Sequence, residues 1–342
     1  MWDKNQYVVS YFLGLGMSNN VASINDIVGA VAGLTVGIIF GAASDTCTSR
    51  WGRRRPFLFI GLITSVICHQ IISYAPEIGR LLGDPEPTST SPNSSIAIAI
   101  MLPFFFLSDF TQNIMQLPQI AIVADFAGDH QASAQMIRII IASLFGRLFS
   151  TFAAYFRPTT SIQNMHIFFF VVDGASILLH IVCYIAANEK VLENKNKKNK
   201  KFCFSIGSVF DETVSGLREL PKSILSFGIC FTFAAFAVAA NLKYLAVTGE
   251  LTFGGDPNGA VTCGTNCTPQ QLDFIRGTDF GSQVLAIAGW ICFGLNFAFF
   301  VLIEPLLIHW GIGKCFAVME LFSGVILFIP LFHNTWVSAT LE

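Results

Sequence analysis

The chain has 342 residues, of which 53% are hydrophobic and only 12% are charged, and its formal net charge is −2. A soluble domain carries roughly 25% charged residues, so this chain has too few charges to cover a water-facing surface of its size. The composition excludes a soluble globular protein, and we expect no nucleic-acid partner.

Long apolar segments predict membrane-spanning helices along most of the chain. A helix needs about 20 mainly apolar residues to cross about 30 Å of hydrocarbon. A short apolar segment at 7–17 comes first, and eight segments of sufficient length follow at 22–44, 56–75, 95–121, 132–156, 164–187, 222–247, 281–308 and 314–333. The predicted fold is an all-α polytopic membrane protein.

Basic residues gather in the loops on one side of this predicted bundle. Four arginines lie between the first two long segments, and eight Lys and Arg residues lie between 188 and 222. Because four spans separate these loops, they fall on the same side, which the positive-inside rule assigns to the cytosol. The glycosylation sequons at Asn93 and Asn266 fall on the opposite side, where glycans are added.

A lysine-rich polar tract, NEKVLENKNKKNKK at 188–201, divides the chain. Its composition predicts a linker between two helical bundles. The predicted parts are an N-terminal bundle at 1–187, a cytosolic basic linker at 188–221 and a C-terminal bundle at 222–342. A solvated cytosolic loop explains the lysines, and a lipid-headgroup or regulatory contact is the alternative.

The loop after the first long segment carries a distinctive motif, GAASDTCTSRWGRRRPF at 41–57. A Gly permits close helix approach, an Asp lies at a helix end, and arginines can pair with acids and helix C-termini of neighbouring spans. Such contacts can hold one conformation and release in another, whereas the alternative is that the arginines only anchor the topology. The candidate gating residues are Gly41, Ser44, Asp45, Arg50, Gly52, Arg53, Arg54 and Arg55.

This motif resembles the loop after span 2 of major facilitator transporters. Its longer form is similar to that of the sucrose–proton symporters and proton-associated sugar transporters, a glycoside-pentoside-hexuronide cation symporter type. Residues 109–125, DFTQNIMQLPQIAIVAD, resemble span 4 of that family, and 10–16, 220–222 and 303–306 resemble further parts of its spans. The family has two bundles of six spans around a midplane site. The resemblance implies alternating access and a chain truncated at both ends, without most of span 1 and without spans 10 to 12.

Several positions depart from the family pattern. Ile120 stands where span 4 of the family carries an Arg implicated in substrate and proton handling. Asn19 stands in place of a His, Leu245-Ala246 in place of a Thr-Asp pair, and Thr46 in place of an Arg. These differences bear on the proton mechanism rather than on the fold.

Polar residues within the predicted spans are candidates for a substrate site, because an ionisable group at this depth is costly without a wet cavity or a partner. Asp109, Asn113 and Gln116 are four and three residues apart and share one helix face. Carboxylate and amide groups on one face can bind the hydroxyls of a sugar. Hydrogen bonding between helices is the alternative role.

Asp173 and His180 are seven residues apart and also share a face, where either could take up a proton. For this pair a structural role is the favoured interpretation. Arg147 is a cation in the middle of a predicted span. We hypothesise that it pairs with Asp109 or Asp173 and replaces the missing family Arg.

The remaining motifs argue against an enzyme. Cys263 and Cys267 lie in a polar loop and could form a local disulfide, but the cysteines form no metal-binding pattern. No phosphate-binding GxxxxGK[ST] sequence and no Ser/His/Asp constellation is readable. We expect no cofactor.

The predicted function is secondary active transport of a sugar, with sucrose or another disaccharide as substrate and a proton as the symported ion. The alternatives are a transporter of a different small solute, and a truncated pseudotransporter or sensor without transport activity. The expected partners are the sugar, protons and the lipid bilayer. The expected location is the plasma membrane, with a vacuolar or other endomembrane as the alternative.

Overall fold

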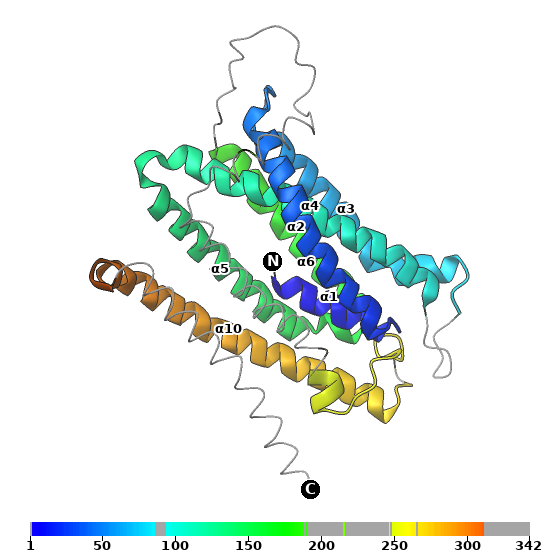
Figure 1. Cartoon of the computed structure of the whole chain (residues 1–342). Coiled ribbons are helices and arrows are strands. Elements are labelled where there is room, and N and C mark those ends of the chain that lie inside the picture. The colour runs from blue at the N-terminus through cyan, green and yellow to red at the C-terminus, as the bar shows by residue number, and fades with distance from the viewer. Residues whose placement is uncertain are drawn as a thin grey trace.

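A computed structural model describes residues 2–85, 94–187, 189, 215, 246, 248–264 and 266–310. In this part of the chain all the regular elements are helical (Figure 1). The long helices are α1 (Trp2–Gly14), α2 (Asn19–Thr46), α3 (Arg55–Leu81), α4 (Ser95–Ala127), α5 (Gln131–Phe156), α6 (Ile162–Ala186) and α10 (Pro269–Trp310). Short helical turns lie at Gly128–His130, Pro158–Thr160 and Thr248–Thr252.

Four helices among the described residues are long and apolar enough to cross a membrane: Arg55–Leu81, Ser95–His130, Ser133–Thr160 and Ile162–Ala186. They coincide with four of the predicted spans, and α2 and α10 contain the predicted spans 22–44 and 281–308. The predicted all-α polytopic fold is confirmed. The predicted spans 222–247, apart from Ala246, and 314–333 lie outside the described residues, as does most of the linker.

Local sequence signals explain where the helices end. Gly83 and Gly128 follow α3 and α4 with φ angles of 113° and 52°, a region that favours glycine. Arg157 adopts a φ of 51° after α5, and Pro158 prevents the helix from continuing. Ser161 then caps α6 by accepting a hydrogen bond from the backbone N–H of Asn164.

Helix α1 lies inside the bundle, which its short length did not predict. Tyr11, Phe12 and Leu13 are at most 1% exposed. The ring of Phe12 packs edge-on against Phe105 of α4, with centroids 5.3 Å apart, and Tyr7 packs near Phe168 of α6 at 5.8 Å. Burial of these large side chains makes α1 the centre of the main apolar core.

The outer surface of the bundle is apolar. Phe170, Leu178 and Ile185 of α6 are 74%, 62% and 80% exposed. A continuous apolar exterior of this kind is suited to lipid rather than to water. Helix α10 runs alongside α5 (Figure 1), where the indole N–H of Trp290 donates to the Thr151 hydroxyl at 2.8 Å.

Candidate transport site

The arginine motif forms an ion-pair network at one end of the bundle, and Arg54 is its centre. This side chain is buried, and its Nε and Nη2 donate to the two carboxylate oxygens of Asp125 at the end of α4, at 2.6 and 3.3 Å. Its Nη1 lies 2.9 Å from Asp45 and 3.2 Å from the Ser44 hydroxyl, both near the end of α2. One guanidinium thus connects the ends of three helices.

The neighbouring arginines extend the network to α6. Arg53 Nη2 lies 2.8 Å from Asp125 Oδ1. Arg55 Nη2 donates to the backbone carbonyl of Tyr184 at 2.9 Å, and the Tyr184 hydroxyl donates to the carbonyl of Arg55 at 2.5 Å. The ends of α3 and α6 are therefore held together by reciprocal hydrogen bonds.

Glu189, at the start of the predicted linker, closes this arrangement from the other side. Its carboxylate accepts the backbone N–H groups of Arg54 at 3.1 Å and of Arg55 at 3.4 Å. A carboxylate at the first N–H groups of a helix is favoured by the helix dipole. Gly52 has a φ of 105° and lies against this side chain, so a larger residue there would be strained and would collide with Glu189.

The charge balance at Arg54 favours its bound, ionised form. Burial lowers the pKa of Arg54, but the hydrogen bond to Asp125 and the charge of Asp45 more than offset this effect, so the pKa is raised above its ordinary value. Bidentate arginine–carboxylate pairs are among the stronger polar contacts in proteins. The contacts are compatible with a gate that holds one conformation. Arg50 is exposed and lies outside the network.

A cavity of about 250 Å³ lies in the interior of the bundle between five helices. Its polar lining comes from α3, α4, α5 and α6: Ser65, His69, Gln112, Ser150, Asp173, Ser176 and His180. Tyr7 of α1 and several apolar side chains complete the wall. Small-ligand sites are usually concave and mostly apolar, with a few polar groups that fix orientation, and this cavity has that character.

The hydroxyl of Ser150 lies in this cavity wall and is buried. Ser150 is 1% exposed, and its Oγ has no hydrogen-bond partner among the described residues. A buried hydroxyl left without a partner costs about 1–3 kcal/mol. A water molecule or a ligand hydroxyl in the cavity would remove this cost.

A chain of buried polar side chains crosses one wall of the cavity. His69 Nδ1 lies 2.7 Å from Asp173 Oδ1, and Gln70 Nε2 donates to Asp173 Oδ2 at 2.8 Å. His69 Nε2 lies 3.0 Å from the Ser108 hydroxyl of α4. The pair therefore joins α3 to α6 and touches α4.

Asp109 and Asn113, two of the three predicted face residues of α4, lie at its interface with α2. A Cβ atom added at Gly29 would lie 3.4 Å from Asp109 Oδ2, and one added at Gly33 would lie 3.6 Å from Asn113 Oδ1. Gln116 is exposed. The contribution of α4 to the cavity is instead Gln112 and Met115, so Asp109 and Asn113 lie against α2 and not in the cavity wall.

Asp173 and His180 both line the cavity, whereas Arg147 does not. The guanidinium of Arg147 lies against Gly289 of α10. Because Asp173 forms its ion pair with His69 and Asp109 faces α2, the hypothesised pairing of Arg147 with either carboxylate receives no support from the described residues.

The sequence analysis did not identify the cavity residues Ser65, Gln112, Ser150 and Ser176, and it also missed three ionisable residues of these sites. His69 is an ionisable residue within a predicted span, and this signal alone could have made it a candidate. Asp125 was recognised only as part of a similar segment, although an acid at a helix end near an arginine loop is a natural partner. No sequence pattern identified Glu189 as a partner of the α3 N-terminus.

The loop at the opposite end of the bundle contains a disulfide between Cys263 and Cys267, whose Cα atoms are 4.8 Å apart. Asn266 lies between them and is exposed, as a glycan acceptor must be, while Asn93 lies outside the described residues. No group of three or more potential metal ligands occurs in the described part of the chain.

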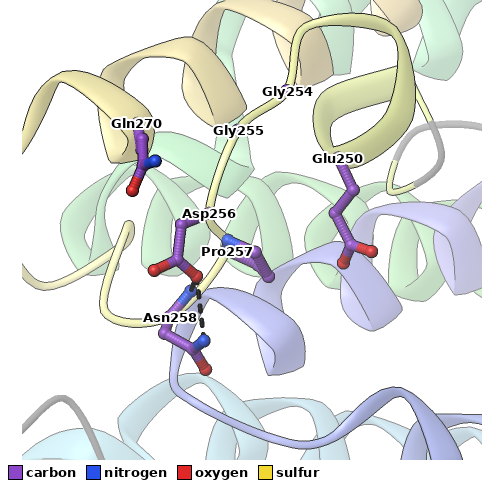
Figure 2. Close-up of a pocket in the computed structure, with 7 residues that line it drawn as sticks. All are labelled: Glu250, Gly254, Gly255, Asp256, Pro257, Asn258 and Gln270. Carbon is purple, nitrogen blue, oxygen red and sulfur yellow. Dashed lines mark hydrogen bonds between the residues drawn. The ribbon is translucent and has the colours of Figure 1, made fainter.

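A depression of about 390 Å³ lies in this loop region, lined by residues of 250–258 and by Gln270 in the first turn of α10. Figure 2 shows these residues. One carboxylate oxygen of Asp256 in this depression already has partners within the loop. Its Oδ1 accepts hydrogen bonds from the backbone N–H of Asn258 at 3.0 Å and from the Asn258 side-chain amide at 2.8 Å. The depression lies outside the predicted spans. The interior cavity is therefore the candidate transport site.

Comparison with known proteins identifies the family. A family described as MFS/sugar transport protein matches residues 6–247, which is more than half of the chain. The chain belongs to this major facilitator sugar transport family. The sequence resemblance is confirmed, and the protein is an integral membrane protein and not an enzyme.

Three relatives illustrate the similarity to named proteins. Sucrose transport protein SUT5 of Oryza sativa subsp. indica is 40% identical over 123 residues, which are 35% of this chain and 23% of the relative. SUT1 of Oryza sativa subsp. japonica is 35% identical over the same length and coverage, and SUC3 of Arabidopsis thaliana is 37% identical over 123 residues, 21% of its length. The matched segment thus spans less than a quarter of each relative.

Proposed function

We propose that this protein transports a sugar across a membrane by proton symport, with sucrose or a similar disaccharide as the substrate. The observation that carries the proposal is the cavity inside the bundle, with polar groups from four helices in its wall, in a chain that belongs to a sugar transport family. The names of its sucrose-transporting relatives support the choice of substrate. The two predicted bundles would rock about this cavity in alternating access.

The lining of the cavity suits a molecule with many hydroxyl groups. Gln112 offers an amide that both donates and accepts, and Ser65, Ser150 and Ser176 offer hydroxyls that do the same. The volume of about 250 Å³ lies just below the roughly 300–1,000 Å³ typical of ligand pockets. A small sugar ring fits this chemistry better than an apolar solute.

The ion-pair network at the arginine end supplies a gate for this function. Arg54, Asp125 and Glu189 connect α2, α3 and α4 to the segment after α6, on the side predicted to face the cytosol. With these contacts formed, that end of the bundle is closed. Opening to the cytosol would separate some of them, and their re-formation would return the transporter to its outward-facing state.

Uptake of labelled sucrose by proteoliposomes that contain the full-length protein tests the function. An inward pH gradient should drive accumulation, and a protonophore should abolish it. Absent uptake, or uptake insensitive to the protonophore, would overturn proton symport of sucrose. A panel of other small solutes in the same assay tests the alternative substrate, and failure of the whole panel would favour the pseudotransporter.

The Ser150→Ala substitution tests whether the cavity holds the sugar. Loss of one hydrogen bond worth about 1 kcal/mol should raise the apparent KM for sucrose about fivefold, with little change in protein yield. Ser73→Ala is the matched control, because Ser73 Oγ is also buried without a described partner but does not line the cavity. An equal effect of both substitutions would contradict the cavity assignment.

The exposed sequon residue Asn266 on the predicted outer side supports a plasma-membrane location. Shift of the protein on a gel after glycosidase treatment, and loss of that shift in Asn266→Gln, would test the orientation on which this proposal depends.

A further inference from the structure

The His69–Asp173 pair lies near the middle of α3 and α6 and is almost completely enclosed. His69 is 6% exposed and Asp173 is 4% exposed. Both carboxylate oxygens of Asp173 have partners, in His69 Nδ1 at 2.7 Å and Gln70 Nε2 at 2.8 Å. The imidazole ring is stacked on Phe169, with centroids 5.1 Å apart, which fixes its orientation.

The hydrogen bonds of this pair define two protonation states with the same heavy-atom geometry. An ionised Asp173 can only accept, so His69 Nδ1 must carry a hydrogen toward it. His69 Nε2 then either accepts from the Ser108 hydroxyl or, after it binds a proton, donates to it. Proton binding therefore neutralises the net charge of the pair and reverses one hydrogen bond to α4.

His69 and Asp173 are two of the four titratable residues that line the cavity, and Asp173 is the only carboxylate among the described lining residues. The other titratable groups that line the cavity are Tyr7 of α1 and His180 of α6. Among the described lining residues, α4 and α5 contribute no titratable side chain, since theirs are Gln112, Met115, Gly146, Phe149, Ser150 and Ala153.

The nearest charged groups on neighbouring helices face elsewhere. Asp109, which follows Ser108 on α4, faces α2, and Arg147 of α5 lies against Gly289 of α10. His180 Nδ1 is engaged with the backbone carbonyl of Ser176 at 2.8 Å. An uncompensated charge inside the membrane costs several kcal/mol, so the cavity wall is energetically sensitive to one proton on this pair.

We propose that His69 and Asp173 together hold the symported proton, and that Ser108 transmits their protonation state to α4. This inference rests on the proposed function of proton-coupled sugar transport. Histidine is suited to the role because its ordinary pKa places its charge change between pH 5 and 8. Both residues line the same cavity as Gln112 and Ser150, so the proton and the sugar share one enclosure.

A second histidine–carboxylate pair between the same two helices provides an internal control. His166 Nε2, near the start of α6, lies 3.4 Å from Glu77 Oε1, near the C-terminal end of α3. This pair lies outside the cavity, and its side chains are 21% and 38% exposed. If the His69–Asp173 pair only holds α3 to α6, its substitution should have the same effect on transport as substitution of the His166–Glu77 pair. If it binds the symported proton, its substitution should impair proton-driven accumulation, whereas substitution of the second pair should not.

The test compares Asp173→Asn and His69→Gln with Glu77→Gln and His166→Gln in proteoliposomes. One assay measures accumulation of labelled sucrose driven by an inward pH gradient, and the other measures exchange of labelled for unlabelled sucrose without a gradient. Asp173→Asn and His69→Gln should lose accumulation at least about tenfold, keep exchange within about threefold, and lose the pH dependence of exchange. The two control variants should keep both activities.

Two results would overturn the proposal. One is accumulation by Asp173→Asn that equals that of the unsubstituted protein. The other is loss of accumulation and exchange together with a lower melting temperature, which would make the pair a structural contact only.

A measurement on the unsubstituted protein keeps the proposal testable if a variant does not fold. Nitrogen NMR of the imidazole rings should show His69 Nε2 gaining a proton as the pH falls. The His69 signals are assigned by their absence from the spectrum of His69→Gln. A ring that keeps one protonation state across the range where accumulation begins would contradict the proposal. If the unsubstituted protein moves no sucrose in either assay, the proposed function fails, and the ring titration still decides whether this pair binds a proton.

Discussion

Arg54 illustrates how much of the ion-pair network depends on one side chain. Its guanidinium faces two carboxylates and one hydroxyl at once, from the ends of α2 and α4. A guanidinium offers five donors in a rigid plane, whereas an ammonium group is a single charged point. The sequence pattern of three consecutive arginines does not distinguish them, but the structure gives each a different partner.

The Arg54→Lys substitution should weaken this network although it keeps the charge. A lysine cannot bind Asp125 with two parallel bonds and reach Asp45 as well, so the free energy of unfolding should fall by about 1–3 kcal/mol. The melting temperature of the purified protein in detergent measures this loss. Arg50→Lys is the matched control, because Arg50 is in the same loop and is exposed. Equal melting temperatures for the two variants would contradict the central role of Arg54.

At the scale of residues, the sequence predicted the arginines of the ion-pair network better than it predicted the acids that bind them. The arginine motif and Asp45 were singled out because charge, glycine and motif spacing are readable in one stretch of sequence. Asp125 and Glu189 lie 71 and 135 positions from Arg54 along the chain, and such partners depend on how the helices pack. His69 was missed for the same reason, since its partner Asp173 lies 104 positions away along the chain.

Among the elements, α2 shows why glycines recur within a membrane helix. Gly29, Gly33, Gly37 and Gly41 are four residues apart and face Asp109, Asn113 and Leu117 of α4. Small residues at this spacing allow two helix backbones to approach closely, which favours packing where no hydrophobic driving force acts between helices in lipid.

The Gly41→Leu substitution should separate α2 from α4 near the gate. A Cβ atom at position 41 would lie 2.8 Å from Leu117 Cδ1 and 3.4 Å from its Cβ, and a full leucine has no room. We expect a loss of about 1–3 kcal/mol in stability, measured by thermal unfolding. Gly174→Ala is the control, because nothing lies within 4 Å of a Cβ there, and alanine should stabilise α6 by about 0.5–1 kcal/mol. A neutral Gly41→Leu would show that the close approach is not needed.

The helices themselves were the most predictable part of the fold. Apolar length alone located α3, α4, α5 and α6, because the thickness of the bilayer sets the length of a spanning helix. The position of α1 was not predictable in this way. Its buried residues Tyr7, Tyr11 and Phe12 look like part of any short apolar segment until the surrounding helices are in place.

The molecule as a whole is held together differently at its two ends. The arginine end has the network around Arg54, whereas at the opposite end Arg157 of the α5–α6 turn pairs with Asp279 of α10 at 3.1 Å. Helix α10 has 42 residues and a length of about 63 Å, so it is longer than the membrane core is thick. Asp279 precedes the predicted span of this helix, at 281–308, and its contact with Arg157 links the helix to the turn between α5 and α6.

The burial of Asp279 should make the stability of the whole protein depend on pH. Burial raises the pKa of Asp279 to about 6, and the nearby Arg157 charge lowers it by less. The buried Oδ1 of Asp279 has no hydrogen-bond partner among the described residues, which is consistent with a carboxyl group that prefers to be protonated.

The sign follows from comparison with the unfolded chain, where an aspartate has a pKa of about 3.9. The folded protein binds the proton more tightly, so the stability from this group is complete below about pH 4 and is lost as the pH rises through about 6. Acidification from pH 7 to pH 5 should therefore add about 1 kcal/mol to the free energy of unfolding.

Asp279→Asn should remove this part of the pH dependence, because the amide resembles the protonated acid at every pH. Asp273→Asn, on the more exposed side of the same helix, should keep the slope of the unsubstituted protein. Identical slopes for Asp279→Asn and the unsubstituted protein in melting experiments at pH 5, 6 and 7 would refute the assignment.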